Sequence, residues 1–262
     1  MRRRLALLPL AWPLARRDIA ARYRGSMAGV GWALLAPLAM VAIYASVFQG
    51  VFKVRWAGST EAAGGFDYAA RLFVGLTVFT AVAEVASRAT RLMQDNANLV
   101  KRVVFPLELL CVALVMQVAV HTALQMLVIA VLLVATGAGP QWSWLWLPAA
   151  WAWSIALQLA LGLGLAALGA YLRDLQQMVP LVMSGLMFLS PVFYPHAAAP
   201  QVLQSLLLFN PVTAPIELSR AAWFGDPVNW SPMLLSLLGL VIALPLAHML
   251  FRRLRPGFAD LV

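Results

Sequence analysis

The sequence predicts an all-α integral membrane protein. Of its 262 residues, 63% are hydrophobic and only 11% are charged, whereas a typical soluble domain is about half apolar and about a quarter charged. The ranges 25–52, 109–172, 175–216 and 227–251 contain no Asp, Glu, Lys or Arg. Each is longer than the roughly 20 apolar residues with which a helix crosses the hydrocarbon core of a bilayer. These observations exclude an ordinary soluble domain.

Apolar runs and turn signals divide the chain into six predicted membrane spans within a single domain, 1–262. The longest uncharged range must hold two helices, because the Gly-Ala-Gly-Pro sequence at 137–140 supplies a break for a hairpin turn. Glu84 and Arg88 would be costly in lipid, so we expect them to face the protein interior or the cytoplasmic interface. The predicted spans are 28–52, 70–90, 108–135, 145–170, 175–194 and 231–251.

Basic residues indicate how these spans are oriented. If both termini are cytoplasmic, every Lys and Arg except Lys53, Arg55, Arg71 and Arg220 lies on the inner side. Short cytoplasmic loops of membrane proteins carry an excess of Lys and Arg. The sequence therefore predicts a multi-pass protein with both termini in the cytoplasm.

Two further segments are expected to form helices that do not cross the bilayer. Residues 12–26 mix apolar side chains with four arginines, which is typical of an amphipathic helix lying along the inner leaflet. Residues 195–230 are apolar but interrupted by prolines, and we expect two short helices that re-enter the outer leaflet or lie in it. Such helices are tolerated in a bilayer only if their backbone is paired or buried in protein.

No energy source or catalytic site is indicated by the residue pattern. A P-loop needs Gly-Lys-Ser or Gly-Lys-Thr, but the two lysines, Lys53 and Lys101, follow Phe52 and Val100. No arrangement of acids, histidines or cysteines suggests a metal site or a catalytic constellation. We therefore predict a chain that is not an enzyme, binds no metal and does not hydrolyse ATP itself.

Glu84 and Glu108 are the acids that a proton-coupled carrier would use within the membrane. Both lie near a predicted cytoplasmic end, where pairing with Arg88, Arg91 or Arg102 is the favoured interpretation. The two halves of the chain show no internal repeat of the kind from which many carriers are built. A membrane subunit driven by another protein is therefore favoured over a stand-alone proton-coupled carrier.

Six segments, taken in order, form a combined pattern. They are 16–37 with Arg-Tyr-Arg-Gly-Ser, 96–106 with Asn-Leu-Val-Lys-Arg, 173–175 (Arg-Asp-Leu), 190–194 (Ser-Pro-Val-Phe-Tyr), 209–211 (Phe-Asn-Pro) and 251–260 with Arg-Leu-Arg-Pro-Gly-Phe-Ala-Asp. The pattern resembles the membrane subunit of ABC-type polysaccharide exporters, which move lipid-linked O-antigen, capsule or teichoic acid chains. An exporter of small drugs or lipids is the alternative within related architectures.

The resemblance implies a homodimer of this chain in a bacterial inner membrane, together with two cytoplasmic ATPase subunits. ATP and Mg would be bound by the ATPase, and this chain would carry no cofactor. The substrate would be an undecaprenyl-linked polysaccharide. The Arg-Tyr-Arg-Gly-Ser start at 22–26 and the tail at 253–260 are most similar to the O-antigen branch, although teichoic acid exporters share much of this pattern.

The resemblance also implies a substrate entrance. The helix at 12–26 would lie at the cytoplasmic mouth, where guanidinium groups suit a diphosphate and a tyrosine ring can stack on a sugar. Anchoring in lipid headgroups is the alternative role for each arginine. The entrance residues would be Arg16, Arg17, Arg22, Tyr23 and Arg24.

The loop between the second and third spans would supply a coupling helix that docks on the ATPase. Leu99 and Val100 would pack into the surface of that subunit, and the turn at 172–177 would be a second contact or a plain solvated turn. The coupling residues would be Asn96, Asn98, Leu99, Val100, Lys101, Arg102, Arg173 and Asp174.

The segment 195–230 would close the periplasmic end of a channel. Glu217 and Arg220 are three apart, so an ion pair is available on one helix face, and we expect an exposed pair worth about 0–1 kcal/mol. The gate residues would be Phe209, Asn210, Glu217 and Arg220. Aromatic rings would line the sugar path, with helix packing or lipid contact as the alternative for each of Tyr44, Phe48, Phe73, Phe79, Tyr171, Phe188 and Phe193.

Overall fold

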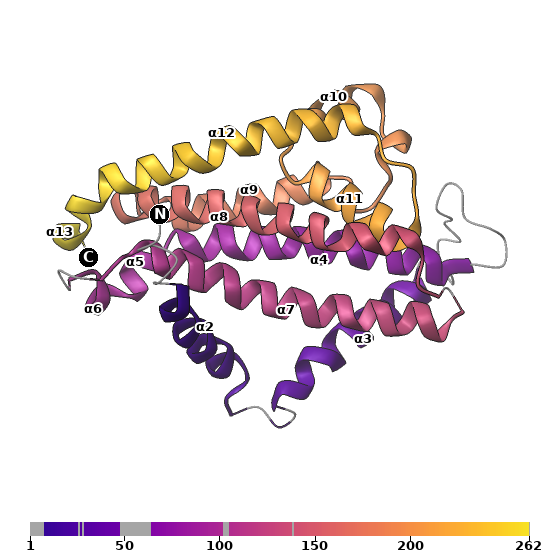
Figure 1. The fold of residues 1–262 in the computed structure, drawn as a ribbon, viewed down its shortest axis with the longest axis horizontal. Coiled ribbons are helices and arrows are strands. Elements are labelled where there is room, and N and C mark those ends of the chain that lie inside the picture. The colour runs from indigo at the N-terminus through magenta and orange to yellow at the C-terminus, as the bar shows by residue number, and fades with distance from the viewer. Residues whose placement is uncertain are drawn as a thin grey trace.

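A computed structural model of the chain describes residues 8–25, 27, 29–47, 64–101, 105–137 and 139–261. All regular secondary structure within these ranges is helical, which confirms the all-α prediction (Figure 1). The remaining residues, among them Phe48, Lys53 and Arg102, lie outside the described part of the chain.

Four long helices form the body of the molecule: α4 (Gly64–Ala89), α7 (Glu108–Ala135), α8 (Leu147–Tyr171) and α12 (Trp230–Leu254). They run side by side along the long axis (Figure 1). The apolar stretches 66–89, 108–135, 142–171 and 232–261 are each long and apolar enough to cross a membrane. The described residues therefore contain at least four candidate spans, as expected of an integral membrane protein.

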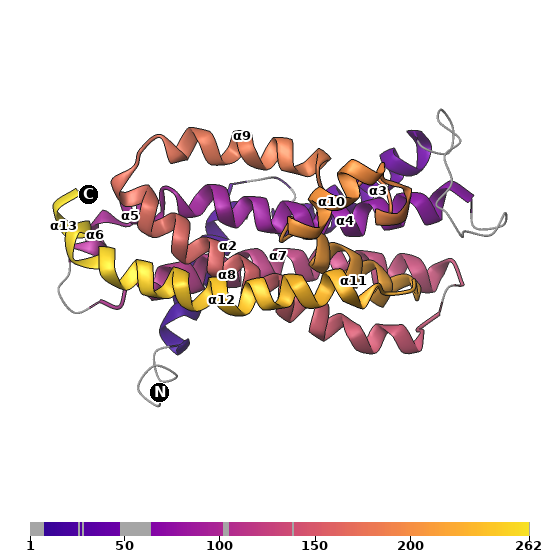
Figure 2. The same cartoon turned by 90° about the horizontal axis from the view of Figure 1, so that it is seen from above.

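Two shorter apolar helices occupy the other two predicted spans. They are α3 (Trp32–Val47) and α9 (Leu175–Phe188), and α9 runs along one edge of the bundle beside α4 (Figure 2). The last predicted residues of the fifth span leave the helix, because the chain turns at Ser190 and Pro191. The number of complete crossings remains a prediction.

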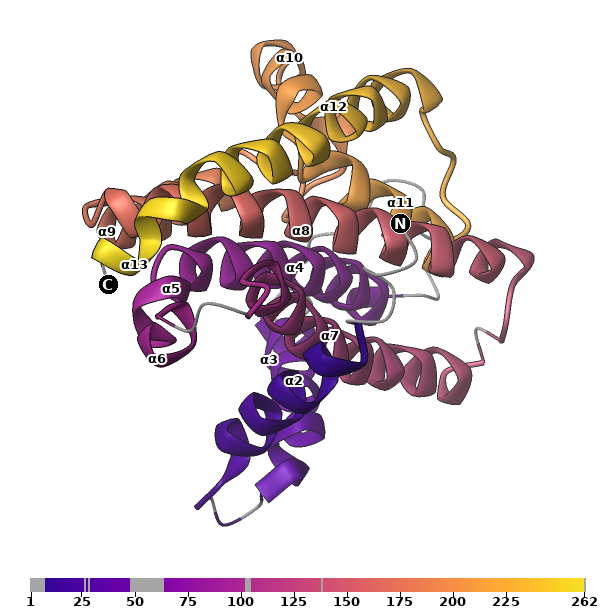
Figure 3. The same ribbon diagram turned by 60° about the vertical axis from the view of Figure 1, so that its left-hand side comes forward.

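The predicted amphipathic segment forms α2 (Leu8–Tyr23), which begins four residues earlier than expected from 12–26. It packs against α7, while α3 contacts both α4 and α7. Ala11 and Ala15 are buried in this contact, and the charged side chains of Arg16 and Arg17 are exposed. Figure 3 shows α2 and α3 projecting together from the bundle.

Helix α4 is the centre of the bundle, with contacts to α3, α7, α8, α9 and α11. Small residues on α8 allow it to approach α4 closely, as is common where membrane helices pack. Gly169 lies directly against the backbone of Thr90, and Ala166 and Ala170 are buried in the same cluster. By contrast, α12 lies over α8 (Figure 3) and leaves most of its apolar surface exposed.

Short helices gather at the two ends of the bundle. One end holds α5 (Leu92–Asp95), α6 (Ala97–Val100), η6 (Arg255–Gly257) and α13 (Phe258–Leu261). The opposite end holds η4 (Trp142–Trp146), η5 (His196–Ala198), α10 (Gln201–Phe209) and α11 (Thr213–Phe224) (Figure 1).

The two short helices predicted between the fifth and sixth spans are present as α10 and α11. They differ in surroundings, because α11 is buried against α4 and α8 while α10 keeps exposed apolar side chains such as Val202 and Phe209. The backbone of α11 is therefore shielded by protein.

Candidate functional site

Arg220 on α11 is the largest side chain among the fully buried residues that the structure describes, with an exposure of 2%. Its guanidinium group donates to three backbone carbonyls, from Nε to Arg71 O at 3.1 Å and from the two terminal nitrogens to Pro191 O and Val192 O. One side chain thereby joins α11, α4 and the turn that follows α9.

The ion pair of Arg220 with Glu217 is present, with Nη1 and Oε1 separated by 3.6 Å, but the expectation of an exposed pair was wrong. Helix spacing correctly placed the two residues together, whereas burial depends on α4 and α8 packing around α11. Burial raises the pKa of the Glu217 carboxyl above its ordinary value, and the positive charge of Arg220 opposes that rise.

Gly75 on α4 makes room for the buried guanidinium group. A Cβ atom at this position would meet Arg220 Nη2 and would lie 3.3 Å from Val192 O. The absence of a side chain at Gly75 is thus what allows Arg220 to reach the carbonyls beyond it.

A second arginine, Arg71, holds the same end of the molecule together. Its Nε donates to Asp67 Oδ2 at 2.9 Å, and its Nη1 donates to Asp226 in the segment after α11. The guanidinium carbon also lies 4.4 Å from the centre of the Phe224 ring, which is within the range of a cation–π contact. From the sequence, Arg71 was expected only as a charge on the outer side, although its four-residue spacing from Asp67 is typical of a helix ion pair.

Asn210 joins two proline turns. Its Nδ2 donates to Leu189 O at 3.1 Å and to Ser190 Oγ at 2.8 Å, while its Oδ1 accepts from the backbone N–H of Val212 at 3.0 Å. The amide therefore fixes the start of α11 to the turn after α9. The preceding residue, Phe209, is 80% exposed and takes no part in these hydrogen bonds.

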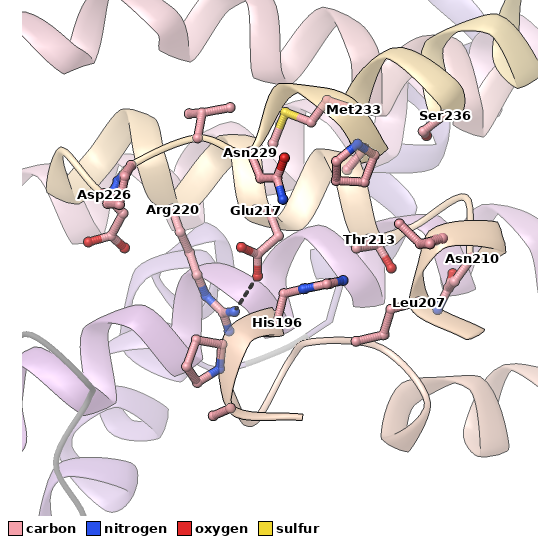
Figure 4. Close-up of a pocket in the computed structure, with 17 residues that line it drawn as sticks. His196, Leu207, Asn210, Thr213, Glu217, Arg220, Asp226, Asn229, Met233 and Ser236 are labelled. Atoms are coloured by element: carbon pink, nitrogen blue, oxygen red, sulfur yellow. Dashed lines mark ion pairs between the residues drawn. The ribbon is translucent and has the colours of Figure 1, made fainter. Parts of the chain in front are cut away.

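These residues border a cavity of about 390 Å³ between α10, α11 and the start of α12 (Figure 4). Buried Leu207, Ala214 and Arg220 form part of its wall, and exposed Pro227 and Asn229 form part of its rim. Further lining side chains are His196, Asn210, Thr213, Glu217, Asp226, Met233 and Ser236.

A second polar cluster lies at the opposite half of the bundle, where α2, α4 and α7 meet. Glu84 Oε1 accepts from Arg22 Nη1 at 2.9 Å and from Arg88 Nη1 at 3.0 Å, and Arg88 also donates to Gln117 Oε1 at 2.8 Å. The predicted pairing of Glu84 with Arg88 is confirmed. Glu108 pairs with Arg255 at 3.7 Å, a partner that sequence spacing did not indicate.

The other entrance residues lie on or just after α2. Arg16, Arg17 and Arg24 are exposed, and Arg17 Nε lies 3.1 Å from Asp18 Oδ1. The Tyr23 side chain lies outside the described part of the structure. Among the described entrance arginines, Arg22 is the one that forms an ion pair with the helix bundle, through Glu84 of α4.

The described coupling residues lie between α5 and α6, on α6, directly after α6, and in the turn between α8 and α9. Asn98, Lys101, Arg173 and Asp174 are exposed. Asn96 is half-buried and donates to Leu92 O at 3.0 Å. The two regions are in contact, because Gln176 Nε2 donates to Gln94 Oε1.

The expectation that Val100 packs against another subunit is wrong, because Val100 is buried within this chain. Val100 is 5% exposed and belongs to a core cluster that also contains Phe258 of α13, with Leu99 packed at its edge. The single turn of α6 places Val100 toward the bundle and Asn98 toward solvent. The apolar pair at 99–100 is accounted for by packing within the chain.

The chain matches the ABC-2 type transporter family over residues 10–224. It belongs to this family. The matched range contains Arg71, Arg220, the Glu84 cluster, α5, α6 and all but the last of the four long helices.

Full-length relatives of this ABC-2 permease are named as polysaccharide export proteins. The O-antigen export system permease protein RfbA of Klebsiella pneumoniae is 23% identical over 98% of this chain and 96% of its own length. The protein of the same name from Myxococcus xanthus is 26% identical over 94% of this chain and 93% of its own. The polysialic acid transport protein KpsM of Escherichia coli is 24% identical over 79% and 78%.

The aromatic residues proposed to line a path in the permease do not share one surface. Phe73 and Phe79 are buried in helix contacts of α4, since that helix is packed on several faces. Of the two roles expected for each ring, Phe73 and Phe79 take the one of helix packing in the described structure. Phe188 is 63% exposed and stacks on Phe193, with ring centres 5.5 Å apart.

Tyr171 is placed by the C-terminal segment of the permease. Its hydroxyl donates to Leu254 O at 2.9 Å, and its ring lies edge-on to Phe258 at 6.1 Å. This residue therefore lies at the end of the bundle that carries α5 and α6. Tyr44 is half-buried, and Phe48 lies outside the described residues.

Proposed function

We propose that this permease is the transmembrane half of an ATP-driven exporter that moves undecaprenyl-linked polysaccharide, in the favoured case O-antigen, across a bacterial inner membrane. The observation that carries the proposal is the similarity to O-antigen permeases along almost the whole of both chains. The exporter would contain two copies of this chain and two ATPase subunits. Both termini would be cytoplasmic, because that topology leaves only four basic residues outside.

The energy for export would come from the ATPase through α5, α6 and the turn before α9. The chain contains no Gly-Lys-Ser or Gly-Lys-Thr sequence, so a P-loop must be supplied by another protein. The exposed side chains of Asn98 and Lys101 offer a docking surface, and the contact between Gln94 and Gln176 would pass a displacement to α9. Gln94 also approaches Gly169 O on α8 at 3.5 Å.

We predict that Asn98→Trp uncouples transport without disturbing the permease fold. The bulky ring would occupy the docking surface, so surface O-antigen and ATPase co-purification should fall by at least about tenfold, the effect of about 1.4 kcal/mol in binding. Permease abundance should stay unchanged. The test is complementation of a permease-deficient strain, read by surface polysaccharide staining and by pull-down of the ATPase.

Val100→Asp is the matched comparison for this loop. Because Val100 is buried, an unpaired charge there should lower permease abundance itself. Wild-type export and normal ATPase co-purification by Asn98→Trp would show that α6 is not the docking surface. Normal surface polysaccharide in the permease-deficient strain would refute the proposed function as a whole.

The polar cluster of α2 would receive the diphosphate of the lipid-linked substrate. Two guanidinium groups share one carboxylate oxygen of Glu84, so the cluster keeps an excess positive charge suited to an anion. We predict that Arg22→Ala combined with Arg24→Ala weakens binding of an undecaprenyl diphosphate lipid several-fold, measured by stimulation of the ATPase in the reconstituted complex. Arg252→Ala, an exposed arginine on α12, is the control, and equal stimulation in all variants would assign the α2 arginines to bilayer anchoring.

A capsular polymer is the second candidate substrate, because the sequence match to KpsM of Escherichia coli covers most of this chain. The same deficient strain distinguishes the two. Loss of capsule with intact O-antigen would reverse the order of the candidates, and transport of a small drug without any polysaccharide defect would favour the drug-exporter alternative.

A further inference from the structure

The cavity beside α11 contains polar atoms for which the described residues provide no hydrogen bond. These atoms are Thr213 Oγ1 and His196 Nε2. Figure 4 shows both side chains near Glu217, whose Oε1 has the ion pair with Arg220 but no hydrogen bond. Thr213 is only 6% exposed. Buried polar groups in folded proteins almost always have a partner, so two such atoms beside a carboxylate at one cavity indicate a ligand with several hydrogen-bonding groups.

The charges around the cavity favour a neutral ligand. Each of the two carboxylates in its lining has an arginine beside it, because Glu217 lies 3.6 Å from Arg220 and Asp226 accepts from Arg71. A free anion would meet two carboxylates, and a cation would meet the buried Arg220. A neutral group that donates to Glu217 and bonds with the hydroxyl of Thr213 has the properties of an alcohol.

The apolar side chains of the cavity lining indicate that the ligand also has an apolar face. Leu207, Ala214 and Met233 are almost fully buried and border the same space. Sites for small molecules are typically cavities of about 300–1,000 Å³ that combine apolar walls with a few placed polar groups, and this one measures about 390 Å³. A sugar ring presents C–H faces to apolar walls and hydroxyls at its edge.

We propose that this cavity binds a single neutral sugar unit through its hydroxyl groups. The source would be the exported chain, and in this respect the inference rests on the proposed function. The cavity lies at the end of the bundle opposite α5 and α6 (Figure 1), and its exposed rim at Pro227 and Asn229 provides access. A sugar leaving the transporter would bind there briefly before the next unit follows.

Saturation-transfer NMR on the complete permease and ATPase complex in lipid nanodiscs tests this assignment. The probes are D-glucose, D-galactose, D-mannose, L-rhamnose and N-acetylglucosamine. At least one sugar should receive saturation, and Thr213→Val should weaken its binding by up to about tenfold, because the shape of the side chain is kept while a hydrogen bond is lost. Glu217→Gln serves as a second variant with the same expectation.

Thr80→Val is the matched control, because the Thr80 hydroxyl already donates to Leu76 O of its own helix at 2.7 Å. It should leave sugar binding unchanged. Absence of saturation for all five sugars would overturn the inference. Binding that neither Thr213→Val nor Glu217→Gln reduces would also overturn it, since the sugar would then occupy another place.

Cell assays separate this inference from the proposed function. Reduced surface polysaccharide in Thr213→Val at normal permease abundance supports the exported chain as the source of the sugar, whereas unchanged export with sugar binding sensitive to Thr213→Val refutes that source. Normal export without sugar binding refutes the cavity assignment alone. Sugar binding in a protein whose deletion spares all surface polysaccharides refutes the proposed function alone.

Discussion

Arg220→Met is expected to destabilise the permease by about 3–5 kcal/mol, the usual cost of breaking a buried ion pair. The substitution keeps much of the apolar volume but leaves the carbonyls of Arg71, Pro191 and Val192 without this donor and Glu217 without its adjacent positive charge. The measurement is the thermal unfolding temperature of the detergent-purified protein, with its yield as a monodisperse species.

Two comparisons show whether the loss comes from the buried network. Arg173→Met replaces an exposed arginine and should unfold at the wild-type temperature. Adding Glu217→Gln to Arg220→Met should recover part of the stability, because no uncompensated carboxylate then remains. Unfolding of Arg220→Met at the wild-type temperature would mean that the three carbonyls do not depend on this guanidinium group.

Gly169→Ala is expected to destabilise the permease by about 1–3 kcal/mol, as overpacking of a helix contact does. The added Cβ would meet the O, Cα and C atoms of Thr90, and backbone atoms cannot rotate away as a side chain can. Helices α4 and α8 would have to separate. Because Gly169 O also faces Gln94 of α5, we expect a reduced rate of ATP-driven export in addition to a lower unfolding temperature.

Gly164→Ala is a control on the same helix. Its Cβ would lie 3.9 Å from the Cβ of Ala247, an ordinary contact, and alanine favours a helix over glycine by up to about 1 kcal/mol. This variant should therefore unfold at the wild-type temperature or above it. Equal behaviour of the two variants would show that the close approach at Gly169 does not limit stability.

The positions of the apolar helices could be predicted because membrane insertion depends on local composition. A run of apolar residues longer than the bilayer core is wide must form a helix whatever it later packs against. The observed limits of α7, Glu108–Ala135, coincide with the prediction, and α12 extends it by only a few residues. Prolines and the Ser-Pro turn likewise marked α10 and α11 as separate short helices.

The surroundings of individual side chains could not be predicted in the same way. Spacing on one helix correctly paired Glu217 with Arg220, but the burial of that pair depends on Gly75, Pro191 and Val192, which are remote in sequence. The cavity beside Thr213 is likewise built from α10, α11 and α12 together. No periodicity within one helix carries that information.

The coupling region shows the same division at the scale of one helical turn. Its location between two spans followed from charge and motif, whereas its outward face is set by contacts with α13 that bury Val100 and leave Asn98 exposed.

The sequence by itself determined that this protein is helical, apolar and divided into membrane-length segments, because each of these properties follows from residues that are neighbours in the chain. The tertiary structure alone decided which charges are buried, which aromatic rings are enclosed and where a cavity opens. Those features arise where several helices meet, and their energies depend on distances between atoms that the order of residues does not specify.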